Sequence, residues 1–466
     1  MIKYDYMTLR PPRISKKWMI FTVTANGTFM STLSAGIVNI ALPTMSAEFG
    51  VSLENIQLVV SFYLLVLTCL LPVFGKLSDM YSRKWMYLGG FITFGMGALF
   101  GALSNSLPMM LLARGVQGVG SSAMMATSQA LIAQIFHGSS RGKAFGAIGA
   151  VVAGGSLAGP AIGGALIQAW GWKSVFWICI PIAILGVWRG IYLIPRFNAH
   201  KRVKMDWPGA ALYTVTSFIF LYALNTAADK GWGSYFILTS FGISFVLFLA
   251  FIKRVQKAKH PFLELSIFQN KTISYGCIVA MFGYTALFTN SVLLPFYLTD
   301  IMHLDPIKIG LLIMPFPVTL AIASAVSGTL NAKWPARVLT TAGFGLLILA
   351  TLMFAFIGNS PSISFIVLAQ LIMGAGSGTF QVPNNNTVVS AAPKGKLGVV
   401  ASMNALCRNV GMILGIALSV AIFTWMQTWC SAHGQVTEQA FIHGYQAAMF
   451  FGTLCAVVGG ILSAKR

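Results

Sequence analysis

The sequence contains very little negative charge. Only 10 of its 466 residues are Asp or Glu, against 31 Lys and Arg, and the formal net charge is +21 at pH 7. Such a basic excess ordinarily suggests nucleic acid, but here the basic residues fall in short loops between apolar runs, and no basic helix with interleaved aromatics occurs. Anionic lipid headgroups explain these loops better. We therefore expect membrane lipid as a partner, and no nucleic acid.

Cysteine is also scarce. The six cysteines show no CxxC pair and no metal-ligand spacing, and most lie in apolar runs, as small buried residues do. The sequence offers no paired carboxylates, His-rich cluster or Ser/His arrangement within reach of one site, which disfavours a membrane-embedded enzyme. We expect no enzymatic activity, no metal and no cofactor.

Long hydrophobic runs dominate the chain. Hydrophobic residues make up 56% of the sequence and charged residues 9%, and the mean hydropathy is +0.77. A membrane span needs roughly 20 apolar residues. This composition predicts an all-α polytopic membrane protein with fourteen transmembrane helices, because apolar runs are centred near residues 30, 66, 96, 120, 154, 184, 217, 244, 285, 317, 348, 373, 412 and 453.

The distribution of Lys and Arg predicts the orientation of these helices. If they alternate from a cytoplasmic N-terminus, only Lys173, Lys230 and Lys308 fall on the outside, and a further three basic residues lie within apolar runs. The first run is too long for a cleaved signal peptide and predicts an uncleaved anchor. Both termini are therefore predicted to be cytoplasmic.

The spacing of the runs predicts two halves of six helices with an inserted pair. Residues 1–17 would form a cytoplasmic segment, 18–195 the first half, 196–260 a linker with two extra helices, and 261–466 the second half. "KLSDMYSRK" follows the second helix of the first half, and "LNAKWPARV" takes the corresponding place in the second. Internal repeats of this kind are typical of secondary transporters, whose substrate site lies between the halves.

Three motifs suggest roles in transport. In "GKLSDMYSRK", Gly75 would let helix ends approach, while Asp79, Arg83 and Lys84 could latch the cytoplasmic side, or the segment is a plain basic turn. In "LLARGVQGVG", Arg114 and Gln117 share a helix face. An arginine so deep in an apolar run is functional by default, the alternative being a structural arginine bound to helix carbonyls.

The third motif, "GGSLAGPAIGG", places small residues at steps of four. Gly155, Gly159 and Gly163 form a bare stripe on which another helix could pack or slide, and Pro160 loosens the helix.

Dense polar side chains in the apolar runs predict a wet pathway. "GAGSGTFQVPNNN" and "NALCRNVG" carry most of them, although Asn384–Asn386 could instead cap a helix end. Aromatics such as Tyr284 could line the pathway or simply pack. The residues predicted to line it are Asn26, Ser34, Asn39, Arg114, Gln117, Tyr284, Asn290, Gln381, Asn385, Asn404 and Arg408.

Together these motifs resemble those of the fourteen-helix drug:proton antiporters of the major facilitator superfamily, the EmrB/QacA type. "IVNIALP", "GKLSDMYSRK", "ARGVQGVG", "GPAIGG", "DWPGAAL", "HPFLELSIF" and "LPFYL" follow one another in the family's order over nearly the whole chain. The resemblance implies a gating role for Gly75, Asp79 and Arg83, proton transfer near Arg114 and Gln117, and antiport at Gly159, Pro160 and Gly163. It also implies alternating access, with export driven by inward proton flow.

The chain departs from this family at one position. Members usually carry Leu-Asp before the "IVN" segment, where this chain has Leu33-Ser34, and all ten acidic residues map to loops or helix ends. A buried carboxylate both binds a proton and attracts a cationic drug. Without one, Arg114 and Arg408 should give the path a positive potential that favours anionic, zwitterionic or neutral cargo.

We therefore expect a monomeric exporter of amphipathic small molecules in a bacterial cytoplasmic membrane, exchanging substrate for protons. Asp79, Asp206, His443 or the substrate itself could carry the proton. The alternative is a dedicated exporter of an anionic or zwitterionic metabolite, siderophore or lipid-like molecule that uses the intramembrane arginines.

Overall fold

The computed structural model describes residues 14–136, 139–195, 205–258, 265–331, 333–359, 361–393 and 397–466. Of the predicted features, most of the cytoplasmic segment 1–17, part of "HPFLELSIF", and the side chains of Asp79 and Pro160 lie outside the described set.

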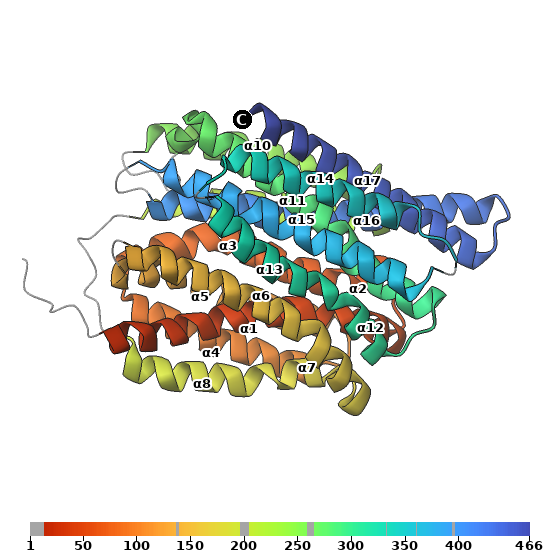
Figure 1. Cartoon of the computed structure of the whole chain (residues 1–466), viewed down its shortest axis with the longest axis horizontal. Helices are drawn as coiled ribbons and strands as arrows, with labels where there is room; N and C mark the ends of the chain where they lie inside the picture. The colour runs from red at the N-terminus through yellow and green to blue at the C-terminus, as the bar shows by residue number, and fades with distance from the viewer. Residues whose placement is uncertain are drawn as a thin grey trace, which may run out of the picture.

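The described chain is helical throughout and forms an elongated bundle (Figure 1). The first group of helices, here the N-terminal group, comprises α1 (Ile14–Phe49), α2 (Leu53–Ile56), α3 (Leu58–Met80), α4 (Arg83–Ala102), α5 (Leu107–Ile135), α6 (Ser139–Trp170), α7 (Ser174–Trp177) and α8 (Cys179–Leu193). A pair follows, α9 (Trp207–Lys230) and α10 (Tyr235–Lys257). The C-terminal group comprises η1 (Leu265–Gln269), α11 (Lys271–Phe296), η2 (Tyr297–Ile301), α12 (Pro306–Ile313), α13 (Pro315–Leu330), α14 (Ala336–Ala355), α15 (Ile363–Ser390), α16 (Leu397–Ala432) and α17 (Thr437–Lys465).

Twelve helices in the described residues are long and apolar enough to cross a membrane, two fewer than the fourteen predicted. The two remaining predicted spans, near residues 120 and 154, are helices α5 and α6 of 29 and 32 residues. Helix α5 falls short by composition, because it carries Arg114, Gln117 and several serines, whereas much of α6 lies outside the described set. The fourteen-helix count is thus not established by length and hydropathy.

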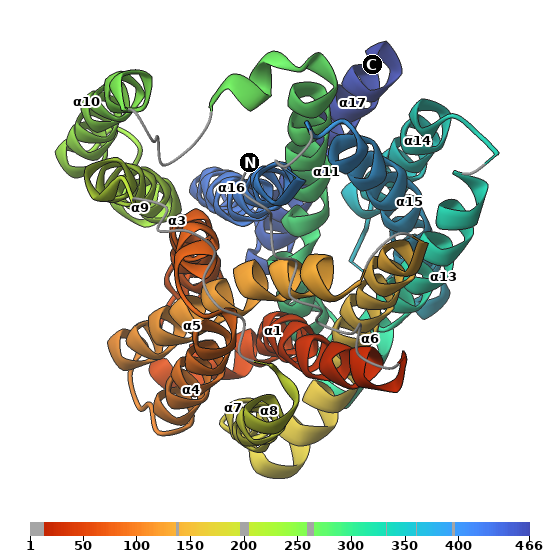
Figure 2. The same ribbon diagram turned by 90° about the vertical axis from the view of Figure 1, so that its left-hand side faces the viewer.

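The two groups repeat the same pattern of helix packing. In the N-terminal group α1 packs on α6, α3 on α5 and α4 on α5, and in the C-terminal group α11 packs on α16, α13 on α15 and α14 on α15. The groups meet where α3 lies against α16 and where α6 lies against α12 and α13. Figure 2 shows α9 and α10 outside both groups, with α9 beside α3 and α16.

The bundle has one end rich in basic residues, here called the basic end. It lies at the left of Figure 1, where α1 begins and α17 ends with Lys465 and Arg466, and α4 begins there with Arg83 and Lys84. The other end, here the opposite end, contains the breaks between α2 and α3, between α7 and α8, and at the single π turn η2. Proline accounts for the break at η2, which Pro295 precedes. It also accounts for a further break, between α12 and α13, because Pro315 is the first residue of α13.

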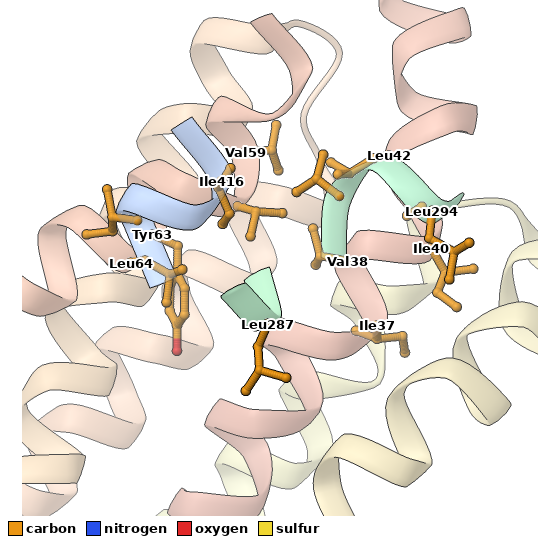
Figure 3. Packing of buried hydrophobic residues seen from close by; sticks show 14 of the residues in the cluster. Ile37, Val38, Ile40, Leu42, Val59, Tyr63, Leu64, Leu287, Leu294 and Ile416 are labelled. Carbon is orange, nitrogen blue, oxygen red and sulfur yellow. The ribbon is translucent and has the colours of Figure 1, made fainter. Parts of the chain in front are cut away.

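An apolar layer joins the groups near the middle of the bundle. Side chains from α1, α3, α11 and α16 converge there, and ten of those drawn in Figure 3 are labelled. They are Ile37, Val38, Ile40, Leu42, Val59, Tyr63, Leu64, Leu287, Leu294 and Ile416. All ten are at least nine-tenths buried.

Candidate functional site

Arg114 of α5 is fully buried and makes hydrogen bonds to three different partners. Its Nε donates to the carbonyl oxygen of Val59 at 2.8 Å, and its Nη1 donates to Gln117 Oε1 at 2.7 Å and to Ser34 Oγ at 3.1 Å. The guanidinium carbon lies 4.2 Å from the ring centroid of Tyr63, a cation–π contact. Helices α1, α3 and α5 thus converge on this one charge.

A chain of hydroxyl groups extends this arrangement. Tyr63 and Ser121 share a hydrogen bond of 2.7 Å, and Ser121 shares another of 3.1 Å with Ser31. We call Ser31, Ser34, Tyr63, Arg114, Gln117 and Ser121 the Arg114 cluster. Sequence reasoning missed Tyr63, Ser31 and Ser121. The available signal was helical spacing, because Ser31 is one turn from Ser34 and Ser121 is one turn from Gln117.

Two buried donors of the Arg114 cluster have no hydrogen-bond partner among the residues that the structure describes. They are Nη2 of Arg114 and Nε2 of Gln117. A buried polar atom without a hydrogen-bond partner costs about 1–3 kcal/mol of stability. Such an atom in a native structure therefore needs an explanation, and one explanation is that it binds a ligand. Both atoms are donors, so the complementary ligand atom is an acceptor.

No carboxylate among the described side chains contacts the Arg114 cluster. The described acids lie at helix ends, where Glu48 accepts from Trp172 Nε1 at 2.6 Å and Asp206 accepts from Arg254 at 3.0 Å. Asp206 also caps α9 by accepting from the Gly209 amide. Arg114 therefore keeps its positive charge in the interior with only neutral partners.

A second polar cluster lies in the C-terminal group. Tyr284 donates to Gln381 Oε1 at 2.8 Å, and the guanidinium carbon of Arg408 lies 5.7 Å from the Tyr284 ring centroid. The Nε of Arg408 is buried without a partner. We call Tyr284, Gln381 and Arg408 the Arg408 cluster. It contributes a further unpartnered donor on a cationic side chain.

The two clusters border the same apolar layer. Tyr63, against which Arg114 stacks, is itself part of that layer. Tyr284 precedes Leu287 by one turn of α11, and Arg408 precedes Ile416 by two turns of α16, on the side of the basic end. The Arg408 cluster thus lies on the basic side of the layer, whereas the Arg114 cluster lies at the level of the layer itself.

The asparagines of α15 do not cap a helix end. Helix α15 continues to Ser390, so that alternative is wrong, and Pro383 does not stop the helix. Asn385 is exposed and accepts from Asn404 Nδ2 at 2.7 Å. Asn384 is instead buried, donates to the carbonyl of Gly276 at 2.9 Å and accepts from Arg466 at 2.6 Å, which ties together α11, α15 and α17.

Five predicted pathway residues lie outside both clusters: Asn385 and Asn404, which bond to each other, and Asn26, Asn39 and Asn290. Asn26 donates to the carbonyl of Ile182 in α8 at 3.3 Å. Asn290 accepts from Tyr445 at 2.6 Å within the C-terminal group. Asn39 donates to Ser291 Oγ at 2.8 Å and joins α1 to α11.

The predicted gating segment is mostly helix rather than loop. Only Tyr81 and Ser82 separate α3 from α4. A Cβ at Gly75 would meet nothing within 4 Å, so the expected close approach of helices there is wrong. Arg83 donates to Gln134 at the end of α5, and Lys84 donates to the carbonyl of Ile191 at the end of α8. These two residues therefore tie helix ends together at the basic end.

The glycine stripe of α6 packs against α1. A Cβ at Gly159 would lie 3.0 Å from the Ile37 amide nitrogen, one at Gly163 would lie 2.6 Å from Ile37 Cγ1, and Gly155 faces Thr32. On its other side α6 meets the C-terminal group, where a Cβ at Gly164 would lie 2.6 Å from the Pro306 carbonyl. Helix α6 is thus held between the two groups.

Comparisons with known proteins identify the family. The model of the Major Facilitator Superfamily matches residues 24–416. The chain belongs to this superfamily. It is 31% identical over 446 residues to the riboflavin transporter RibZ of Clostridioides difficile, covering 95% of this chain and 96% of that protein. It is 28% identical over 418 residues to the multidrug transporter protein MdtP of Bacillus subtilis, covering 88% and 75%.

A solved structure shows the same fold. The crystal structure of the human organic anion transporter MFSD10 covers 96% of this chain and 99% of its own, with a TM-score of 0.66 at 15% identity. Members of the superfamily are transporters, so this chain is a polytopic membrane transporter. Its bacterial relatives agree with a bacterial plasma membrane.

Proposed function

We propose that the protein is a secondary active transporter that exports amphipathic small molecules bearing hydrogen-bond acceptors, either neutral or anionic, by alternating access. The observation that carries the proposal is the buried Arg114, which has neutral partners only and lies beside two unpartnered donors, Arg114 Nη2 and Gln117 Nε2. A carbonyl or carboxylate oxygen would satisfy them. A cation would meet uncompensated like charge.

The contacts between the two groups support alternating access. Two hydrogen bonds join the N-terminal and C-terminal groups, counting only the residues that the structure describes: Asn39 to Ser291 at 2.8 Å, and Thr424 to Glu54 at 2.6 Å. Glu54 lies at the opposite end, and the apolar layer joins helices of the two groups. This arrangement is a state closed on the outside if the basic end is cytoplasmic.

We place all fourteen long helices across the bacterial cytoplasmic membrane, including α5 and α6, with both termini inside and α9 and α10 inserted between two halves of six. A buried guanidinium and bare glycine stripe lower hydropathy without preventing insertion, because these groups face protein rather than lipid. We expect a monomer, since each group already packs on its neighbour within one chain.

Proton coupling is part of the proposal, with protons entering as substrate leaves. Asp206 is an unsuitable carrier, because it caps α9 and pairs with Arg254. For an anionic substrate, Arg114 would be the counter-ion.

A second candidate function is transport of riboflavin or a similar neutral heteroaromatic molecule. The observation that favours it is the 31% identity with the riboflavin transporter RibZ over nearly the full length of both chains. The carbonyl oxygens of such a ring could accept from Arg114 and Gln117, while Tyr63 and Tyr284 offer aromatic faces.

The two candidates can be separated in liposomes containing the purified protein and an imposed proton gradient. We would measure uptake of three fluorescent probes: anionic fluorescein, neutral riboflavin and cationic ethidium. Transport of fluorescein supports the first proposal, transport of riboflavin alone supports the second, and preferential transport of ethidium contradicts both. The Arg114→Ala variant in the same liposomes controls for leakage.

A further inference from the structure

A cavity of about 490 Å³ lies at the turn between α16 and α17, away from both polar clusters. This turn is at the opposite end, on the right of Figure 1. Met426, Cys430, Gln435 and His443 line the cavity together with aromatic side chains. None of the residues predicted to line the substrate pathway lines this cavity, so the cavity is separate from that pathway.

Three side chains in this cavity carry soft or borderline metal ligands. Cys430 Sγ lies 3.7 Å from His443 Nδ1, across the gap between α16 and α17. Met426 precedes Cys430 by one helical turn, which places its thioether on the same face of α16. His443 Nδ1 also lies 2.8 Å from Gln435 Oε1, which orients the imidazole ring.

The separation of sulfur and nitrogen fits a shared cation. Zn²⁺, a d¹⁰ ion, binds a thiolate at about 2.3 Å and an imidazole nitrogen at about 2.0–2.1 Å. With a bond angle between tetrahedral and trigonal values, these lengths place the two ligand atoms roughly 3.5–3.8 Å apart. The observed 3.7 Å lies within this range, so Cys430 and His443 are close enough to bind one d¹⁰ cation together.

The ligand set selects the kind of cation. In the described residues no group of three or more His, Cys, Asp or Glu is arranged around one point, so a four-coordinate zinc centre is not provided for. A thiolate, a thioether and an imidazole suit soft monovalent ions that accept low coordination numbers. We propose that Cys430, His443 and Met426 form a binding site for a soft monovalent d¹⁰ cation such as Cu(I) or Ag(I).

Binding replaces two existing bonds. The Cys430 thiol loses its proton to water as its sulfur binds the cation, and His443 Nδ1 gives up its contact with Gln435 and coordinates as neutral imidazole. The bound ion then bridges α16 and α17. No change of oxidation state is involved when Ag⁺ is the probe.

The test is silver binding to the purified full-length protein by titration calorimetry in chloride-free buffer. We expect the wild type to bind one more Ag⁺ than Cys430→Ser, and His443→Ala and Met426→Leu to bind that ion at least tenfold more weakly. The matched control is Cys455→Ser. Cys455 lies in α17 and is buried like Cys430, but it does not line the cavity. Size-exclusion profiles and melting temperatures without silver establish that each variant is folded. His443→Gln serves as a second variant should His443→Ala fail to fold.

Equal silver stoichiometry and affinity in wild type and Cys430→Ser would overturn the site. So would loss of the tightest silver ion in Cys455→Ser with Cys430 intact. The measurement does not involve transport, so its outcome is independent of the proposed function.

Discussion

Ser34 Oγ accepts a hydrogen bond from Arg114 Nη1 at 3.1 Å, at the position where the motif that this sequence resembles has an aspartate. A carboxylate there would pair with the guanidinium and neutralise it. A hydroxyl leaves the charge in place and satisfies only one of its donors. This single contact accounts for the positive character that we assign to the substrate path.

Restoring the acid should therefore change substrate preference. We expect Ser34→Asp to lower the ratio of fluorescein to ethidium transport at least tenfold, which corresponds to about 1.4 kcal/mol. Ser34→Asn is the matched control, because it has the size of Asp without its charge. An unchanged ratio in Ser34→Asp liposomes would refute our account of the path.

Arg114 itself should be needed for transport rather than for folding. Arg114→Ala should reduce flux to background, and Arg114→Lys should reduce it more than tenfold, since an ammonium cannot reproduce the planar set of bonds to Val59, Gln117 and Ser34. Arg189→Ala is the control, because Arg189 also lies in an apolar run but donates its hydrogen bond to Thr22 in an exposed position. If Arg114→Ala keeps wild-type flux with normal size-exclusion behaviour, Arg114 is structural.

The sequence predicted an all-helical membrane protein with Arg114 in its interior, but it did not predict the residues that surround this arginine. Helical spacing placed Gln117 beside Arg114, because that relation is local. The contacts with Val59, Tyr63 and Ser34 join three helices that are far apart in sequence, and no periodic pattern reveals which faces meet. Hydropathy failed at α5 for a related reason, since its buried polar residues make the span less apolar.

Helix α6 offers a test of close packing. Gly159→Ala would place a Cβ within 3.0 Å of the Ile37 nitrogen and 3.1 Å of the Gly36 carbonyl carbon, so α1 and α6 must separate. We expect a loss of about 1–3 kcal/mol of stability, seen as a lower melting temperature, together with reduced flux. Gly154→Ala, where nothing lies within 4 Å, should melt at or above the wild-type temperature. Equal melting of the two variants would contradict the packing.

Asp206 should prove structural rather than proton-carrying. Asp206→Asn keeps a helix cap but loses the charge-assisted bonds to Arg254, and we expect it to lose about 1–2 kcal/mol of stability while keeping proton-driven flux within twofold. Asp206→Ala, which removes both the cap and the pairing, should melt lower still. Loss of proton dependence in correctly folded Asp206→Asn would instead place Asp206 on the proton path.

The bond between Thr424 and Glu54 should help to hold the outside closed, since it links α16 to α2 across the two groups. A hydrogen bond to a carboxylate contributes about 1.5–3 kcal/mol, so its removal should raise the outward-open population roughly tenfold or more.

The opening can be measured with a cysteine introduced in the apolar layer by Leu287→Cys. Its thiol becomes accessible to a membrane-impermeant maleimide, added outside, when the protein opens outward. Labelling should be fast in the Thr424→Val background and slow in the parent, and the same chain without Leu287→Cys corrects for native cysteines. Combining Thr424→Val with Glu54→Ala should add little beyond either change alone, because both remove one interaction. Equal labelling rates with and without the bond would show that the apolar layer alone keeps the outside closed.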